Sequence, residues 1–76
     1  MTITADMIRD YLNYEEYQEL LYNIAVGLPA AVDKPNYRDN IETILKYHLG
    51  ADKLEELIIK EFSANYDPDD LIEYYS

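Results

Sequence analysis

The 76-residue sequence contains no cysteine and no tryptophan, and only two glycines, three prolines and one histidine. The absence of cysteine excludes disulfides, thiolate metal sites and a cysteine nucleophile, and is typical of proteins in a reducing cytoplasm. The two glycines are isolated, which excludes a glycine-rich phosphate-binding loop. No apolar run is long enough to span a membrane, and the first residues lack the cationic and apolar segments of a secretion signal. We therefore expect a cytoplasmic protein with no membrane contact.

Basic residues are also scarce, because six Lys and Arg stand against 16 Asp and Glu, for a formal charge of -10. Nevertheless 49% of the residues are hydrophobic, which is too many for a disordered acidic chain, so the chain should fold. The excess of acids lies at the two ends, residues 1–19 and 61–76, whereas residues 33–60 are nearly neutral. Since nucleic acids and anionic membranes repel such a protein, the composition favours a basic protein surface as the partner.

Residues 13–28, NYEEYQELLYNIAVGL, form the clearest predicted helix. Asn13 followed three residues later by Glu16 is a capping-box pattern, which marks the start of this helix. At about 100° per residue, apolar residues fall in one stripe and polar residues on the opposite face. The stripe contains Tyr14, Tyr17, Leu21, Ile24 and Leu28, and the polar face contains Glu15, Glu16, Glu19 and Asn23.

Four further segments, residues 5–12, 37–49, 53–64 and a short stretch from 68, also show helical periodicity. Their apolar positions are Met7, Ile8, Tyr11 and Leu12; Tyr37, Ile41, Ile44, Leu45 and His48; Leu54, Leu57, Ile58 and Phe62; and Leu71, Ile72 and Tyr75. No segment alternates with period two for long enough to indicate a strand. The sequence therefore predicts an all-α fold, a compact bundle of four to five short helices in a single domain covering residues 1–76.

Residues that favour helix ends support these boundaries. Thr4 can cap the first helix, and Asp67 followed by proline can start the last one. Asp52 with Glu55 repeats the capping-box pattern before the helix at 53–64, and Gly50 is a suitable stop for the helix before it. Residues 30–36, flanked and interrupted by prolines, are the one loop-like stretch of any length.

His48 and Glu61 are the polar residues that fall on predicted apolar stripes. A histidine there can act as a pH switch or a general base, but the more common role is that of a core or core-edge residue with locally satisfied nitrogens, which is our prediction. For Glu61 two hypotheses stand: it pairs with His48 or a lysine, or it reaches solvent from the edge of the bundle.

The sequence lacks the patterns of an enzyme or a metal site. Adjacent acids such as Glu15 and Glu16 diverge by about 100° on a helix and cannot share a substrate. Asp67, Asp69 and Asp70 suggest a calcium loop, but Leu71 and Ile72 occupy the positions that need an oxygen ligand and a glycine. These acids are better explained as cap and dipole partners of a helix. We expect no catalytic residue, no metal and no cofactor.

Nine tyrosines are the least ordinary feature of the chain. Several lie on core stripes, whereas Tyr22 falls beside the acids of residues 13–28 and Tyr74 lies within the acidic C-terminal stretch. Tyrosine beside carboxylates suits a basic partner, because the rings stack on arginine while the acids steer and pair with it. The predicted partner-binding residues are Glu15, Glu16, Glu19, Tyr22, Asp67, Asp69, Asp70, Glu73 and Tyr74.

In size, charge and the acidic runs YEEYQE and DPDDLIEYY, the chain resembles the small, acidic, cysteine-free inhibitors encoded by bacteriophages and mobile elements. These include anti-CRISPR and anti-restriction proteins, some of which imitate DNA. The resemblance covers the whole chain and includes no diagnostic motif. It implies evasion of host defence in the host cytoplasm by occupation of a basic nucleic-acid channel, with carboxylates in place of phosphates and tyrosines where bases stack. The lysines in the middle of the chain imply that only part of the surface imitates DNA.

Two other binding functions stay open. DYLNYEEYQELLYNI and DLIEYY are similar to stretches of the nuclease-colicin immunity proteins, although the order of elements differs and a proline is missing. The layout of short helices with LP and HLGADKLEELI is similar to bacterial death-like adaptor domains, which implies self-association, for example as a homodimer, or recruitment of an effector.

Overall fold

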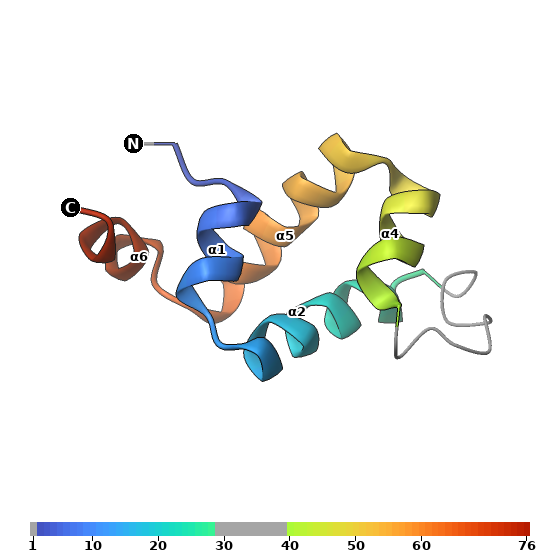
Figure 1. Ribbon diagram of the computed structural model, residues 1–76, viewed down its shortest axis with the longest axis horizontal. Helices are drawn as coiled ribbons and strands as arrows, with labels where there is room; N and C mark the ends of the chain where they lie inside the picture. Colours follow the sequence, from blue (N-terminus) through green and yellow to red (C-terminus); the bar gives the residue numbers. More distant parts are fainter. Residues whose placement is uncertain (1, 29–39) are drawn as a thin grey trace.

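The computed structural model describes residues 2–28 and 40–76, which form five helices and no strand (Figure 1). In chain order the helices are α1 (Ala5–Tyr11), α2 (Tyr14–Val26), α4 (Ile41–Leu49), α5 (Ala51–Asn65) and α6 (Pro68–Tyr74). The all-α bundle predicted from helical periodicity is therefore confirmed. The predicted loop at 30–36 and the predicted helical residues 37–39, Tyr37 among them, lie outside the described residues.

Three of the helices have the N-terminal caps that the sequence predicts. The Thr4 hydroxyl accepts a hydrogen bond from the Met7 amide, 3.2 Å away. Asn13 and Glu16 form a complete capping box, in which each side chain accepts from the other's amide, at 2.8 and 3.1 Å. The Asp67 carboxylate caps α6 by accepting from the amide two residues later, at 2.9 Å. These bonds satisfy amides that a helix leaves unpaired in its first turn.

The turn between α4 and α5 depends on Gly50, which has φ 84° and ψ 160°. Residues with a Cβ rarely adopt this conformation, so a glycine is required there. Its amide donates to the Lys46 carbonyl, 2.8 Å away, and so closes the last turn of α4. The prediction that Gly50 stops this helix is confirmed.

The capping box expected of Asp52 and Glu55 is wrong. Helix α5 begins at Ala51, directly after Gly50, and no side chain caps it. The carboxylate of Glu55 accepts a hydrogen bond from the Ala5 amide, 3.0 Å away, and so caps α1 instead. Because α1 packs against α5, a glutamate one turn into α5 lies within reach of the amides at the start of α1.

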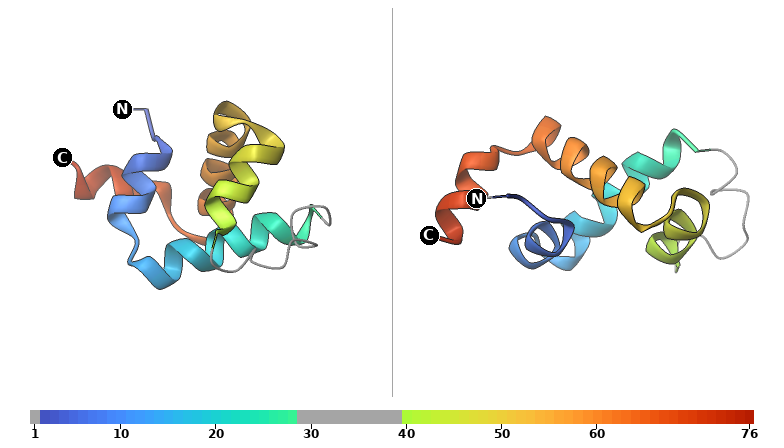
Figure 2. Two further views of the ribbon diagram at one scale, coloured as in Figure 1. Left: turned by 45° about the vertical axis from the view of Figure 1, so that its right-hand side comes forward. Right: turned by 90° about the horizontal axis from the view of Figure 1, so that it is seen from above.

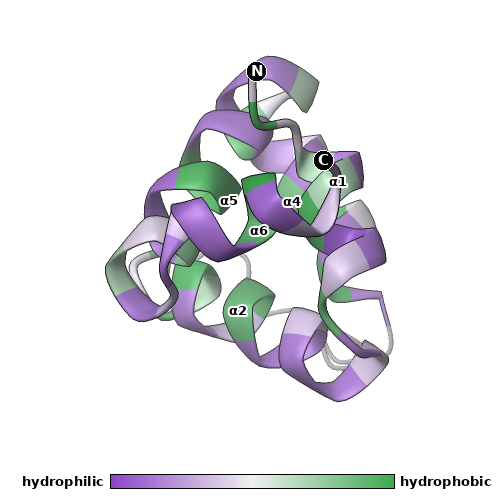
Figure 3. Ribbon diagram, turned by 90° about the vertical axis from the view of Figure 1, so that its left-hand side faces the viewer, coloured by the Kyte–Doolittle hydropathy of each residue, from purple (hydrophilic) through white to green (hydrophobic). Residues whose placement is uncertain are grey.

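Helices α2 and α5 are the centre of the bundle, because they contact each other and each also contacts α1 and α4. Helix α6 packs against α1, so the first and last helices lie side by side at one end of the molecule (Figures 1 and 2). Hydrophilic and hydrophobic residues are interspersed along the helices (Figure 3). The core consists of Ile8, Leu12, Tyr17, Leu20, Leu21, Ile24, Ala25, Ile41, Leu45, Leu54, Ile58, Phe62 and Leu71.

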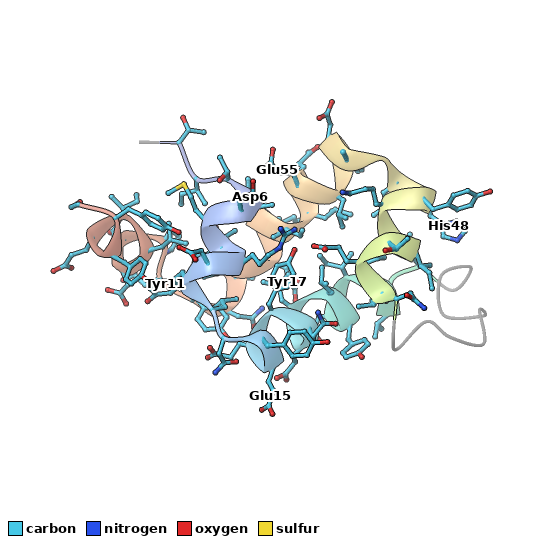
Figure 4. All side chains as sticks on the ribbon, in the orientation of Figure 1. Asp6, Tyr11, Glu15, Tyr17, His48 and Glu55 are labelled. Carbon is cyan, nitrogen blue, oxygen red and sulfur yellow. The ribbon has the colours of Figure 1, made fainter. Side chains whose placement is uncertain are left out.

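Two predicted core residues are exposed. Tyr14 is 77% exposed, because the buried face of α2 is centred nearer to Tyr17, Leu20 and Ile24 than the predicted stripe. His48 is also exposed, since it lies in the last turn of α4, after the buried Ile41 and Leu45. In Figure 4 the His48 side chain points away from the bundle, and its ring lies edge to face against Tyr47. The prediction of a core or core-edge histidine is therefore wrong.

Candidate partner-binding surface

The acids predicted to bind a partner lie on α2 and α6, and α1 contacts both of these helices. Glu15 and Glu19 are exposed on the outer face of α2, and Figure 4 shows Glu15 pointing away from all other helices. Tyr22 is half-buried on the same helix and packs against the core. Glu16 is half-buried in the first turn of α2, where it forms the capping box. The other five predicted residues are exposed at the start of α6 and along it, and they are Asp67, Asp69, Asp70, Glu73 and Tyr74. Helix α1 contacts both α2 and α6, so both acidic segments lie next to it, and we call α1, residues 14–19 of α2 and α6 with its Asp67 cap the acidic end of the molecule.

Tyr75 fixes α6 to α1. Its hydroxyl lies 2.9 Å from a carboxylate oxygen of Asp10 and 3.2 Å from the Met7 carbonyl, and can donate to either. Partial desolvation and the Asp10 carboxylate raise the pKa of Tyr75. Next to it the rings of Tyr11 and Tyr74 meet edge to face, with centroids 5.3 Å apart. Tyrosine contacts thus hold helix α6 against α1, and the acids of α6 remain exposed. Tyr74 itself is 59% exposed.

A shallow open hollow of about 220 Å³ lies between α2 and the end of α5, and we call it the α2–α5 notch. It is lined by Glu16, Glu19, Leu20, Asn23, Asn65 and Tyr66, with no Lys or Arg among them. The Tyr66 ring stacks on Phe62, with centroids 5.1 Å apart and planes 11° from parallel. Partial desolvation and the charges of Glu16 and Glu19 raise the pKa of Tyr66. The notch therefore combines negative charge, amide groups and an aromatic ring.

Glu61 lies close to the notch and does not pair with His48. The Asn65 amide nitrogen donates to the Glu61 carbonyl at 2.9 Å and approaches its carboxylate at 3.3 Å. His48 lies just before the start of α5 at Ala51, and Glu61 lies ten residues, or about 15 Å of helix, further along α5. The hypothesis of a His48–Glu61 pair is wrong, because the two helices meet at the end far from Glu61.

A second polar cluster joins α1, α2 and α4, and nothing in the sequence pattern indicates it. One carboxylate oxygen of Glu42 accepts from the Tyr17 hydroxyl at 2.5 Å and from the Arg9 guanidinium at 2.7 Å. The guanidinium also lies over the Tyr17 ring, 5.4 Å from its centroid, and approaches Asp6 at 3.4 Å. The sole basic residue of α1, α2 and α6 is therefore already paired within the molecule.

The contacts within this cluster shift the pKa values of Tyr17, Glu42 and Arg9. Burial and the bond to Glu42 raise the pKa of Tyr17 to about 12. Partial burial opposes ionisation of Glu42, but the hydrogen bonds from Tyr17 and Arg9 outweigh it and lower the pKa of Glu42. Contact with the Tyr17 hydroxyl raises the pKa of Arg9, against partial desolvation and together with Glu42. The cluster is a structural tie with a neutral tyrosine and an ion pair.

Comparisons with protein families, with known proteins and with solved structures find no match to this chain. No helix in the described part of the chain is long and apolar enough to cross a membrane. Within residues 2–28 and 40–76, no group of three or more His, Cys, Asp or Glu side chains is placed to hold a metal ion.

The acids of the notch follow from the sequence pattern, whereas its other wall does not. Glu16 and Glu19 were predicted from the polar face of residues 13–28, whereas Asn65 and Tyr66 come from the far end of α5. The spacing of four between Phe62 and Tyr66 is a local signal for their stacking. No local signal places that ring beside α2, because this depends on how α2 and α5 cross.

Proposed function

We propose that this protein is a non-enzymatic, acidic binding protein that occupies the basic surface of a nucleic-acid-binding defence complex and inhibits it, as anti-CRISPR proteins do. One observation carries the proposal. Helices α1, α2 and α6 with the Asp67 cap carry nine acidic residues and one basic residue, Arg9. That residue is bound to Asp6 and Glu42, so it leaves the other acids of this end uncompensated.

Such a surface acts in two ways on a basic partner. Exposed carboxylates attract the partner over a distance and raise the association rate, an effect that salt screens within about 8 Å at physiological ionic strength. Tyrosines at the same end then supply apolar contact area and rings on which arginine stacks. Tyr14 and Tyr74, 77% and 59% exposed, are placed to do so.

Inhibition follows from competition. A basic channel that binds nucleic acid through phosphates and stacked bases cannot bind it while carboxylates and tyrosines fill the same positions. The lysines of the described part, Lys46, Lys53 and Lys60, are all on α4 and α5. A partner that approaches the end formed by α1, α2 and α6 therefore meets few positive charges.

The test is a pull-down of the tagged protein from nuclease-treated bacterial lysate, eluted with rising salt. We expect a basic nucleic-acid-binding complex that DNA or guide-bound competitor displaces. The charge reversals Glu15→Lys with Glu19→Lys, and Asp69→Lys with Glu73→Lys, should lower the salt needed for elution. The matched control is Asp52→Lys with Glu56→Lys, which makes the same charge change at the same spacing on exposed positions of α5. An equal fall in the eluting salt concentration for the control variant would refute the proposal. Capture of a protein that nucleic acid does not displace would also refute it.

A second candidate function, a death-like adaptor that self-associates, is favoured by one residue. Tyr47 is 83% exposed on α4, a helix outside the acidic end, and a large exposed aromatic side chain is a common anchor of protein contacts. An adaptor of this kind forms dimers or larger assemblies that Tyr47→Ala dissolves, and light scattering after gel filtration measures this. A monomer at high concentration would exclude a homodimer.

A further inference from the structure

The outer face of α2 and the α2–α5 notch beside it have no covering element in the described part of the chain. Glu19 is exposed there and makes no hydrogen bond or ion pair within residues 2–28 and 40–76. Glu16 gives one oxygen to the Asn13 amide and lines the notch as well. This negative hollow with an aromatic wall is complementary in charge to a planar cation, which can also stack on the ring.

We propose that the α2–α5 notch receives an arginine side chain of the basic partner, with its guanidinium against the Tyr66 ring and hydrogen-bonded to Glu19. The proposal rests on the proposed function, since it names the point at which that partner is gripped. The expected occupant of the notch is an arginine on a protein surface, and not a free metal ion or a lysine.

The molecule itself contains an occupied example of this arrangement. Arg9 lies over the Tyr17 ring and binds Glu42 at 2.7 Å, so one guanidinium is held by a ring and a carboxylate together. The notch presents the same two groups, Tyr66 and Glu19, without a cation of the described chain. Its position at the molecular surface makes a partner's arginine the natural occupant.

The asparagines of the notch favour arginine over lysine. A guanidinium is planar, stacks on a ring and donates in several fixed directions, whereas an ammonium group is compact and strongly hydrated. Asn23 and Asn65 add amide oxygens to the carboxylates around the hollow, and each is a possible acceptor for an N–H that Glu19 does not bind. A lysine could pair with Glu19 but would leave the ring and these acceptors unused.

The other acidic places are less suited to this role. Asp67 already caps α6, and Asp69 and Asp70 stabilise its first turn. The hollow between α1, α4 and α5 is negative in part, but Arg9 and Lys46 line it. The notch, in contrast, combines a ring with an exposed carboxylate and has no Lys or Arg in its lining.

The test is an NMR titration of the ¹⁵N-labelled full chain with two probes, acetyl-tetra-arginine amide and acetyl-tetra-lysine amide, at low salt. We expect the largest tetra-arginine shifts at Glu19, Asn23, Asn65 and Tyr66, and weaker binding of tetra-lysine. Glu19→Gln and Tyr66→Leu should each weaken tetra-arginine by about two- to fivefold, the range of a partly exposed ion pair or cation–π contact. Tyr66→Phe keeps the ring and should bind like the native chain.

Glu15→Gln is the matched control, because it removes the same charge from the same helix outside the notch. If Glu15→Gln weakens tetra-arginine binding less than Glu19→Gln does, the result supports the notch as the binding site. If the two variants weaken binding equally, the proposal is overturned. Tetra-arginine shifts confined to α6 overturn the notch but leave the proposed function intact. Notch binding of tetra-arginine without capture of any nucleic-acid-binding complex supports the site and refutes the proposed function.

Discussion

The Glu42→Gln substitution tests how far one carboxylate holds α1, α2 and α4 together. Glutamine keeps the shape but removes the charge that Tyr17 and Arg9 share at 2.5 and 2.7 Å. The Arg9 and Glu42 side chains are 50% and 35% exposed, so their pair belongs with surface salt bridges, which contribute about 0.2–1 kcal/mol. The Tyr17 hydroxyl also loses a charged acceptor, and a hydrogen bond to a charged group contributes about 1 kcal/mol more than one to a neutral group. We expect the free energy of unfolding to fall by about 1–2 kcal/mol.

For a domain of this size, a loss of that order lowers the melting temperature by about 5–15 °C, which circular dichroism at 222 nm measures directly. Urea unfolding should show a lower midpoint with the same slope. Glu56→Gln is the matched control, since Glu56 is exposed and 4.0 Å from Lys53. It should change stability by less than about 0.5 kcal/mol. If Glu42→Gln unfolds with the native midpoint, the cluster is not a structural tie.

The pH dependence gives a second readout of the same pair. The folded state lowers the pKa of Glu42 below its ordinary 4.5, so its contribution is fully present above that pH and is lost as pH falls through the folded pKa. The stability gap between the native chain and Glu42→Gln should be constant at neutral pH and close in acid. The folded state raises the pKa of Tyr17 to about 12, so its contribution is lost as pH rises toward 12. A gap that persists at pH 2 would contradict this assignment.

Three further substitutions test single contacts. Gly50→Ala places a Cβ at φ 84°, and calorimetry should show a loss of about 1–3 kcal/mol, whereas no loss would mean that the turn adopts another conformation. Glu55→Ala removes the cap on the Ala5 amide and should cost about 1 kcal/mol in urea unfolding, while a neutral effect would show that α1 does not need it. Tyr75→Phe removes the bonds to α1, so amides of α6 should exchange faster by hydrogen exchange while those of α5 do not change. Unchanged exchange in α6 would show that apolar contacts alone hold it.

The features that could be predicted from the sequence are those that neighbouring residues determine. Thr4, the Asn13–Glu16 pair and Asp67 lie within three residues of the amides they cap, so pattern and structure agree. The same holds for α6, where proline follows the cap, and for Gly50, whose position after a periodic segment indicated a stop.

The errors and omissions come from contacts between distant residues. Glu55 lies three residues after Asp52, as in a capping box, yet it bonds an amide 50 positions away. The Tyr17–Glu42 bond spans 25 positions and the Tyr75–Asp10 bond 65, and neither leaves a periodic signal. His48 shows the related limit, because periodicity gives the direction of a helical face and not how far along the helix that face is covered.

The same acids act in opposite directions on folding and on binding, and salt separates the two effects. At a formal charge of -10 the acids repel one another in the folded chain and destabilise it. Raising the ionic strength from 0.01 to 1 M shortens the screening length from about 30 to about 3 Å and should raise the melting temperature. The same change should weaken capture of a basic partner, because it screens the attraction between them. A protein whose melting temperature falls with salt would show that paired charges such as Arg9–Glu42 outweigh this repulsion, and that the acidic end is not uncompensated in solution.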